Sequence, residues 1–164
     1  MLVSSEEFYM KKVAIVTGAN GKIGRTFVDS LVAKGYFVYA VDLKIEELKN
    51  SENVELVQLD ITDEESVHDF FLSVHNLSVL INNAGIGVFT PFEDRTAAEF
   101  KKVMEVNLLG SFLMSQAAVK IMKERGGGKI VNIASVYGST SSDERIYGDS
   151  GRNNSEVYSA SKAG

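Results

Sequence analysis

The stretch TGANGKIG spans residues 17–24 and follows an apolar run at 12–17. Its three glycines are Gly18, Gly21 and Gly24, and an amphipathic run comes directly after them. Glycines at a strand-to-helix turn let backbone N–H groups approach an anion, and the positive end of the helix dipole adds to the attraction. Glycines of this kind also occur in ordinary turns, so the segments around them decide between the two interpretations.

Short apolar runs alternate with amphipathic ones along the rest of the chain. The apolar runs are rich in Val, Ile and Tyr and are bounded by Gly, Asn or Asp, which predicts strands at 12–17, 36–42, 53–60, 78–83 and 128–135. Helices are predicted at 22–34, 44–49, 63–75, 95–124 and from about 155 onward, with Thr62 as the cap of the third. This alternation predicts the α/β class, with a Rossmann-like doubly wound parallel sheet in three α/β/α layers.

Length and composition indicate one ordinary globular domain. The chain has 164 residues, of which 45% are apolar and 24% charged, with a net charge of −5. No apolar run is long enough to cross a bilayer and no basic cluster suits nucleic acid, so neither partner is expected. Cysteine is absent and the two histidines lack partner ligands, so no metal site is expected. Absence of cysteine fits a reducing compartment, and a cytoplasmic location is predicted. Residues 1–10 are interpreted as an N-terminal leader and 11–164 as the domain.

An acidic residue ends the second predicted strand. Asp42 stands 24 residues after Gly18. A carboxylate at this position accepts hydrogen bonds from both hydroxyls of an adenosine ribose and repels a 2′-phosphate. Lys22 and Arg25 act in the opposite sense, because a cation near the loop attracts phosphate. The position of Asp42 is the more diagnostic, so the sequence predicts a dinucleotide site for NAD, with NADP less favoured.

Polar positions also follow the next two predicted strands. Asp60 either bonds an adenine edge or caps a turn, and the sequence leaves both alternatives open. In the motif NNAG, Asn82 or Asn83 is expected to bridge strands through its amide, which is a structural role. Ala84 and Gly85 leave space for a ribose to lie against the backbone.

The motif YSASK places Tyr158 and Lys162 four residues apart, on one face of a helix. A free phenol has a pKa of about 10 and is a poor base at neutral pH. Lowering such a pKa by about 3 units takes roughly 4 kcal/mol, which a cation about 4 Å away supplies at an effective dielectric near 20. A tyrosine–lysine pair can therefore serve as an acid/base, although the same spacing occurs where an amphipathic helix carries a surface lysine.

Two more polar residues suggest chemistry. Ser135 ends the fifth predicted strand, where its hydroxyl could bond a substrate carbonyl or alcohol oxygen. Asn107 interrupts an otherwise apolar helix and is either a tolerated core residue or a holder of a proton-relaying water. One face of the 95–124 helix is expected on the sheet and another against a second subunit. Side chains expected in the core include Phe70, Phe71, Phe112 and Met114.

With these motifs in order, the chain resembles the short-chain dehydrogenase/reductase family from Lys11 to its last residue. The resemblance rests on TGANGKIG, Asp60 in LDITD, NNAG, NIAS with the upstream VNLLG, and YSASK. It implies an NAD(P)-dependent oxidoreductase that transfers hydride between a nicotinamide and an alcohol/carbonyl substrate. It also implies homo-oligomers, which in the family are usually built on the long helix and the helix of the tyrosine–lysine pair.

The resemblance implies a role for each matching position. Tyr158 would exchange the proton, Ser135 would position the reacting oxygen, Lys162 would bond the nicotinamide ribose and Asn107 would hold the relay water. The residues expected to contact the cofactor are Gly18, Asn20, Gly21, Lys22, Ile23, Gly24, Asp42, Leu43, Asp60, Ile61, Asn83, Ala84, Gly85, Tyr158 and Lys162.

Three features depart from the family pattern. Lys22 stands where the compact branch usually has glycine, which resembles the extended branch, whereas NNAG and YSASKAG look like the compact branch. Ser135 and Tyr158 are 23 residues apart, and the polar insert between them predicts a polar, sugar-like substrate. The insert also gives a weaker resemblance to short-chain oxidoreductases of bacterial flagellin or surface-sugar modification. The chain ends two residues after Lys162, where family members continue, so a C-terminally truncated domain is expected.

Two alternative functions follow from these departures. The glycine spacing and the long gap between serine and tyrosine favour a nucleotide-sugar epimerase or dehydratase that recycles bound NAD. The early end of the chain favours an inactive, truncated binding module.

Overall fold

The computed structural model describes residues 11–45, 49–140, 143–150 and 154–164. Five strands form one sheet: β1 (Val13–Thr17), β2 (Phe37–Asp42), β3 (Val54–Gln58), β4 (Leu77–Asn82) and β5 (Lys129–Asn132). They lie in the order β3-β2-β1-β4-β5, and neighbouring strands pair in parallel. This order confirms the predicted doubly wound parallel sheet.

The helices follow the strands in alternation. The α-helices are α2 (Lys22–Ala33), α3 (Glu64–Leu72), α4 (Ala97–Met104), α5 (Ser111–Glu124) and α6 (Glu156–Ala163). A π-helical segment, η2 (Glu105–Gly110), joins α4 to α5, so the single helix predicted over 95–124 is divided around Asn107. Short 3-10 turns are η1 (Phe92–Asp94), η3 (Val136–Gly138) and η4 (Glu144–Ser150), and the last two lie within the polar insert between Ser135 and Tyr158.

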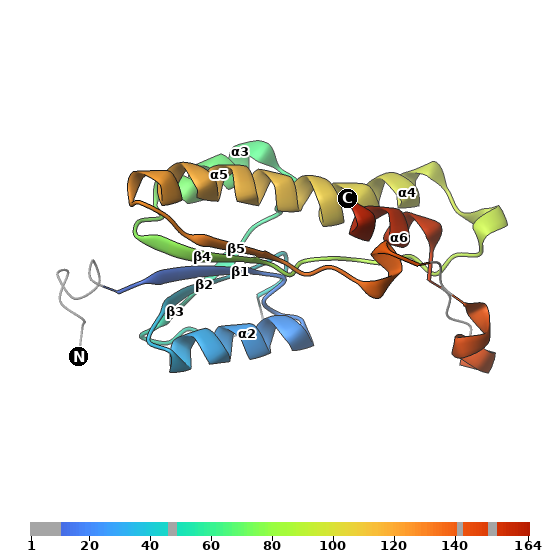
Figure 1. The fold of residues 1–164 in the computed structure, drawn as a ribbon, viewed down its shortest axis with the longest axis horizontal. Coiled ribbons are helices and arrows are strands. Elements are labelled where there is room, and N and C mark those ends of the chain that lie inside the picture. The colour runs from blue at the N-terminus through green and yellow to red at the C-terminus, as the bar shows by residue number, and fades with distance from the viewer. Residues whose placement is uncertain (1–10, 46–48, 141–142, 151–153) are drawn as a thin grey trace.

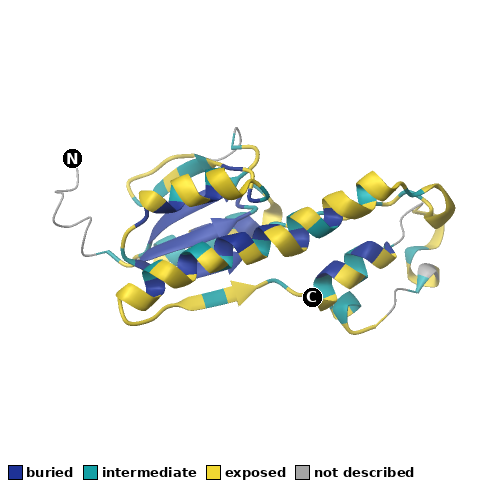
Figure 2. Cartoon of the chain, turned by 90° about the horizontal axis from the view of Figure 1, so that it is seen from above, coloured by how far each residue is buried: buried dark blue, intermediate teal, exposed yellow. Residues whose placement is uncertain are grey.

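The sheet lies between two helical layers. In Figure 1, α2 covers one face of the sheet and α3 and α5 cover the other. Every residue of β1 is buried, and so are the first five of β2, because these central strands have helices on both sides. Figure 2 shows β5 largely exposed at the edge of the sheet. Two apolar clusters, one on each face, therefore share the sheet as their common wall.

The carboxyl ends of the strands define the end of the molecule where polar groups collect. The strand arrows in Figure 1 run toward η1, η3, η4 and α6, which lie beyond that edge of the sheet. The chain order reverses between β1 and β4, since β1 is followed outward by β2 on one side and by β4 on the other. Ligands of such sheets bind at this switch point.

Three expectations differ from the structure. Residues 44, 45 and 49 are not helical, and the middle of the helix predicted at 44–49 lies outside the described residues. Asp63, not Thr62, caps α3, because its carboxylate accepts bonds from the N–H groups of Glu65 (3.1 Å) and Ser66 (3.2 Å). Phe112 is 56% exposed, so its assignment to the core was wrong.

The core assignments of Phe70, Phe71 and Met114 hold. Phe71 and Met114 are buried, and Phe70 packs partly buried against them. Both histidines are exposed, and no group of metal-ligating side chains occurs among the residues that the structure describes. Within the same residues, no helix is both long and apolar enough to cross a membrane. The proposed leader at 1–10 lies outside the described part of the chain.

Candidate cofactor cleft and catalytic site

Close backbone packing shapes the glycine loop. Gly18 has a φ of +63°, and a Cβ built on it would lie 2.8 Å from the Cα of Ala84. A Cβ on Gly24 would lie 2.1 Å from the carbonyl oxygen of Gly18. Neither position accommodates a side chain, because each would meet rigid backbone. The sequence therefore needs glycine at both positions to fold the loop back on the start of α2.

The start of α2 carries no side-chain cap and no acidic residue. Gly21 is the N-cap, and its lack of a side chain leaves the first N–H groups of the helix without a side-chain acceptor. The first turn of any helix has N–H groups with no intrahelical partner, and they carry the positive end of the dipole. The uncapped end of α2 is therefore suited to an anion such as phosphate.

Asparagines fasten the loop to the sheet. The Asn83 amide donates to the carbonyl oxygens of Thr17 and Gly18, both at 3.0 Å. The Asn82 amide donates to Ser115 Oγ (2.9 Å) and Asn132 Oδ1 (2.8 Å), which joins β4 to α5 and β5. Both asparagines have the structural role that the sequence predicted for at least one of them.

Asp42 is the last residue of β2 and is held in place by backbone donors. Its Oδ2 accepts from the N–H of Asn20 at 2.9 Å, and its Oδ1 accepts from the N–H of Lys44 at 3.1 Å. Each carboxylate oxygen keeps a further lone pair for a ligand. The Asn20 amide oxygen in turn accepts from Arg25 at 2.7 Å, so this guanidinium points at the loop.

Asp60 lies two residues after β3 and closes a turn. Its Oδ1 accepts from both the N–H (2.9 Å) and the hydroxyl (2.7 Å) of Thr62. The turn-capping alternative is therefore present in the structure. Because Asp60 also lines the cleft described next, the adenine-edge alternative stays a prediction.

A cleft of about 540 Å³ opens between these loops at the carboxyl ends of the strands. Of the residues predicted to contact a cofactor, those that line it are Gly18, Gly21, Lys22, Ile23, Gly24, Asp42, Leu43, Asp60, Ile61, Asn83, Ala84 and Gly85. Three predicted contacts are not in this lining: Asn20, Tyr158 and Lys162. Sequence reasoning missed the lining residues Val41, Leu59, Ile86, Lys102 and Val106. Lys102 and Val106 come from the helix beside the cleft, and no motif marks them.

Tyr158 and Lys162 share one face of α6, as their spacing predicted. The ammonium nitrogen of Lys162 lies 5.8 Å from the centroid of the Tyr158 ring and donates to the carbonyl of Ile133 at 2.8 Å. Burial lowers the pKa of Lys162, since desolvation disfavours its charged form. A Cβ on Gly85 would lie 3.5 Å from the Lys162 nitrogen, so the tyrosine–lysine pair meets the cleft at Gly85.

The buried side chain of Asn107 joins three parts of the site. Its oxygen accepts from the N–H of Ile86 at 2.8 Å, and its amide donates to the carbonyl of Ile86 at 3.0 Å and to Ser161 Oγ at 2.9 Å. Ser161 Oγ then donates to the carbonyl of Tyr158 at 2.8 Å. Both amide hydrogens and one lone pair of the amide oxygen are thus occupied, which leaves the second lone pair of that oxygen for a donor such as a water.

Ser135 lies three residues beyond β5, where it caps the turn η3 instead of ending the strand as predicted. Its hydroxyl oxygen accepts from the N–H of Tyr137 at 3.2 Å. The turn packs directly on α6, because a Cβ on Gly138 would lie 2.4 Å from the carbonyl oxygen of Lys162. Ser135 is therefore held next to the helix that carries Tyr158, and its O–H hydrogen is free to turn toward a ligand.

An ion pair that sequence reasoning missed fastens the start of α6. The Arg95 side chain is 4% exposed and pairs with Glu156, which lies in the first turn of α6. Arg95 also donates to the carbonyl of Thr90. These bonds connect the segment from Thr90 to Arg95 with α6. Tyr158 lies in the same helix, two residues after Glu156.

Curated proteins with similar sequences include dehydrogenases and reductases. The chain is 34% identical over 162 residues to the NAD-dependent glycerol dehydrogenase of Listeria innocua, covering 93% of this chain and 59% of that protein. It is 33% identical over 166 residues to the 3-oxoacyl-[acyl-carrier-protein] reductase of Aquifex aeolicus, covering 93% of this chain and 63% of that protein. The chain thus spans about three-fifths of the length of these relatives.

Solved structures show the same fold. A short chain dehydrogenase of Leptospira borgpetersenii with bound NAD+ superimposes with a TM-score of 0.85 at 39% identity, covering 99% of this chain and 65% of that one. The NADP-bound structure of ElxO superimposes with a TM-score of 0.80 at 28% identity, covering 94% of this chain and 63% of that one. The family model for short chain dehydrogenases matches residues 12–164, and the chain therefore belongs to the short-chain dehydrogenase/reductase family.

Proposed function

We propose that this chain forms the cofactor-binding and catalytic part of an NAD(H)-dependent oxidoreductase that acts on an alcohol/carbonyl pair. The observation that carries the proposal is the meeting of two features at Gly85. The cleft at the strand ends reaches this glycine, and the Lys162 ammonium of the tyrosine–lysine pair lies beside it. A dinucleotide in the cleft would therefore have one end next to Tyr158.

The cleft suits a dinucleotide in its shape and its polar groups. The uncapped start of α2 and the bare backbone at Gly18 and Gly24 offer donors and close approach to a pyrophosphate. Asp42 offers carboxylate lone pairs to the adenosine ribose, and Gly85 leaves space for the second ribose. When bound, the nicotinamide would supply or accept the hydride.

Four side chains would take part in moving the proton and holding the reacting oxygen. The Tyr158 hydroxyl donates its proton to a carbonyl oxygen during reduction and takes it back from the alcohol during oxidation. The Lys162 ammonium is held by the carbonyl of Ile133 and stabilises the phenolate electrostatically. The Ser135 hydroxyl donates a hydrogen bond to the reacting oxygen, and the acceptor side of Asn107 holds a water that relays the proton onward.

Asp42 supports NAD as the cofactor in preference to NADP. Its carboxylate lies in the cleft wall with both oxygens already fixed by backbone donors, so a 2′-phosphate would meet a negative charge that cannot turn away. Similar structures hold NAD+ in one case and NADP in another, so the proposed preference for NAD is supported by Asp42 and not by the comparisons.

The polar insert supports a polar substrate, and the long helical segment from α4 to α5 supports a homo-oligomer. The insert between Ser135 and Tyr158 favours a polar substrate, in line with the glycerol dehydrogenase among the relatives. Exposed apolar side chains on α4, η2 and α5, namely Phe100, Leu109 and Phe112, favour a homo-oligomer. The cytoplasmic location stays a prediction from composition.

The alternative of a nucleotide-sugar epimerase or dehydratase is not favoured, because the relatives described above are named a dehydrogenase and a reductase. The inactive binding module is separated from the enzyme by the experiment that follows.

Replacing Tyr158 by Phe in the complete protein tests the acid/base role. We expect turnover with NAD+ and an alcohol to fall by about 10²–10⁴-fold, because the proton acceptor is lost. The dissociation constant for NAD+, measured by calorimetry, should stay within about threefold, since the ring still fills its place. Tyr36→Phe, before β2 and away from the cleft, is the matched control. Retained turnover in Tyr158→Phe would refute the role, and a wild-type protein without any turnover would favour the inactive module.

A further inference from the structure

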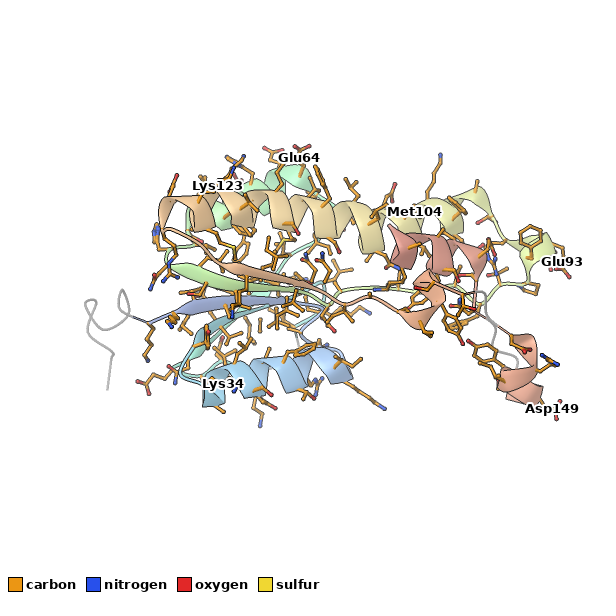
Figure 3. All side chains as sticks on the ribbon, in the orientation of Figure 1. Lys34, Glu64, Glu93, Met104, Lys123 and Asp149 are labelled. Atoms are coloured by element: carbon orange, nitrogen blue, oxygen red, sulfur yellow. The ribbon has the colours of Figure 1, made fainter. Side chains whose placement is uncertain are left out.

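The insert between Ser135 and Tyr158 carries a partly buried aromatic side chain in η4. Within η4, Ile146 is 66% exposed and Arg145 is exposed, whereas Tyr147 is half-buried. Figure 1 shows η4 beyond the carboxyl ends of the strands, as α6 is, but on the side of the sheet where α2 lies. Figure 3 labels Asp149 in η4 and Glu93 in η1, at the tips of the two segments that project from this end. Of these three η4 residues, Tyr147 is therefore the one whose side chain is partly covered by the rest of the molecule.

Tyr147 contacts a residue that is itself fixed in the catalytic site. Its phenol oxygen lies 2.8 Å from the phenol oxygen of Tyr137. Tyr137 lies two residues after Ser135, and its N–H donates to the Ser135 hydroxyl. The turn that carries Tyr137 packs on the backbone of Lys162 through Gly138. Through this chain of contacts the insert is connected to the catalytic serine and to α6.

The two phenols have hydrogen-bonding capacity left over. In their mutual bond one hydroxyl donates and the other accepts, so one O–H hydrogen stays unused. Among the residues that the structure describes, no second hydrogen bond reaches either phenol oxygen. The pair can therefore donate one bond and accept others. This combination matches a hydroxyl group, which also both donates and accepts.

The surroundings of the pair favour an uncharged partner group. Arg145, the cation two residues before Tyr147, is bound through two of its nitrogens to Asp143. The pKa of Tyr147 is raised first by its hydrogen bond to Tyr137 and then by desolvation. Tyr147 therefore keeps its proton at neutral pH.

We propose that Tyr137 and Tyr147 form a specificity site that binds a second oxygen of the substrate, next to the carbon that reacts at Tyr158. The site selects alcohols with a neighbouring hydroxyl group, such as vicinal diols and polyols, over alcohols with an alkyl group at that place. The inference rests on the proposed function, because it assigns the reacting carbon to Tyr158. It gives the polar insert a purpose that the cofactor cleft and the catalytic residues do not require.

The test compares 2,3-butanediol with 2-butanol as probes of the complete protein with NAD+. We expect wild type to favour the diol in kcat/KM, and Tyr147→Phe to reduce the ratio of the two kcat/KM values about tenfold, as expected for one lost hydrogen bond. Tyr137→Phe should reduce the ratio similarly, because it breaks the same pair. Ile146→Ala, an exposed change in the same turn, is the control and should leave the ratio unchanged.

A binding measurement keeps the two proposals separate. Saturation-transfer NMR on the NAD+-loaded protein measures the preference for the diol without turnover. Tighter binding of the diol that is lost in both phenylalanine variants would support the specificity site. If the wild-type protein nevertheless oxidises neither alcohol, the proposed function would be overturned. An equal effect on both alcohols, an unchanged ratio, or no preference in the wild-type protein would overturn the site.

Discussion

Gly24→Ala should stabilise the protein if helix propensity controls the start of α2, and destabilise it if the packing of the glycine loop does. Alanine is the better helix former, and in a helix interior the exchange alone stabilises by about 1 kcal/mol. In this structure the added Cβ would lie 2.1 Å from the carbonyl oxygen of Gly18, although ordinary contact begins at 3.4 Å. It would also lie 2.8 Å from the Cα of Ala19. Both neighbours are backbone atoms, so no side-chain rotation relieves the overlap.

The expected cost follows from that overlap of 1.3 Å, the difference between 3.4 and 2.1 Å. Overpacking by one methyl group costs about 1–3 kcal/mol, and a rigid backbone neighbour favours the upper end. Subtracting the propensity gain of about 1 kcal/mol leaves a net destabilisation of about 2 kcal/mol. At a urea m-value of about 2 kcal/mol/M, the unfolding midpoint falls by about 1 M.

Urea denaturation of the complete protein, followed by circular dichroism, measures this shift. Gly21→Ala is the matched control, because Gly21 has an ordinary φ of −70° and its Cβ would lie 3.3 Å from the same oxygen. It should lose only about 0.5–1 kcal/mol through a poorer N-cap. A Gly24→Ala protein as stable as wild type, with an unchanged m-value, would refute the packing argument and leave helix propensity as the controlling effect.

Two further predictions concern the framework of the site. Asn82→Ala removes the amide that donates to Ser115 Oγ and Asn132 Oδ1, and it should lower the free energy of unfolding by about 2–3 kcal/mol in the same urea titration. The control is Asn132→Ala, at an exposed position, which should lower the free energy of unfolding by less than half of that amount. The pKa of Glu99 is held below its ordinary 4.5 by hydrogen bonds from Thr90 and from the threonine that caps α4, so its contribution to stability is present above pH 4.5 and is lost as the pH falls through the lowered value. Glu99→Gln should therefore be less stable than wild type at neutral pH, with a difference that shrinks in acid; a difference independent of pH would contradict the capping argument.

Sequence reasoning located the parts of the site whose chemistry depends on local spacing. The glycine loop, the strand-end Asp42 and the tyrosine–lysine pair each follow from residues close together in the chain, and the structure places them at one end of the sheet. Parallel strands bring their carboxyl ends to the same edge, so a correct strand pattern also groups these residues.

Sequence reasoning did not predict the features that depend on contacts between residues far apart in the chain. Lys102 lines the cleft because α4 passes beside it, and Arg95 meets Glu156 across 61 residues of chain. Apolar periodicity also could not separate Phe112, which is exposed on α5, from the buried Met114 two residues later. Hydrophobicity shows that a side chain avoids water, but not whether the sheet or another surface covers it.

Parallel calorimetric titrations of the complete protein with NAD+ and NADP+ test the central claim most directly. Asp42 lies in the cleft wall, so NAD+ should bind at least about tenfold more tightly, a difference of about 1.4 kcal/mol. Asp42→Ser should narrow that difference, because it removes the charge that opposes the 2′-phosphate. Equal or tighter binding of NADP+, or no binding of either dinucleotide, would contradict the account.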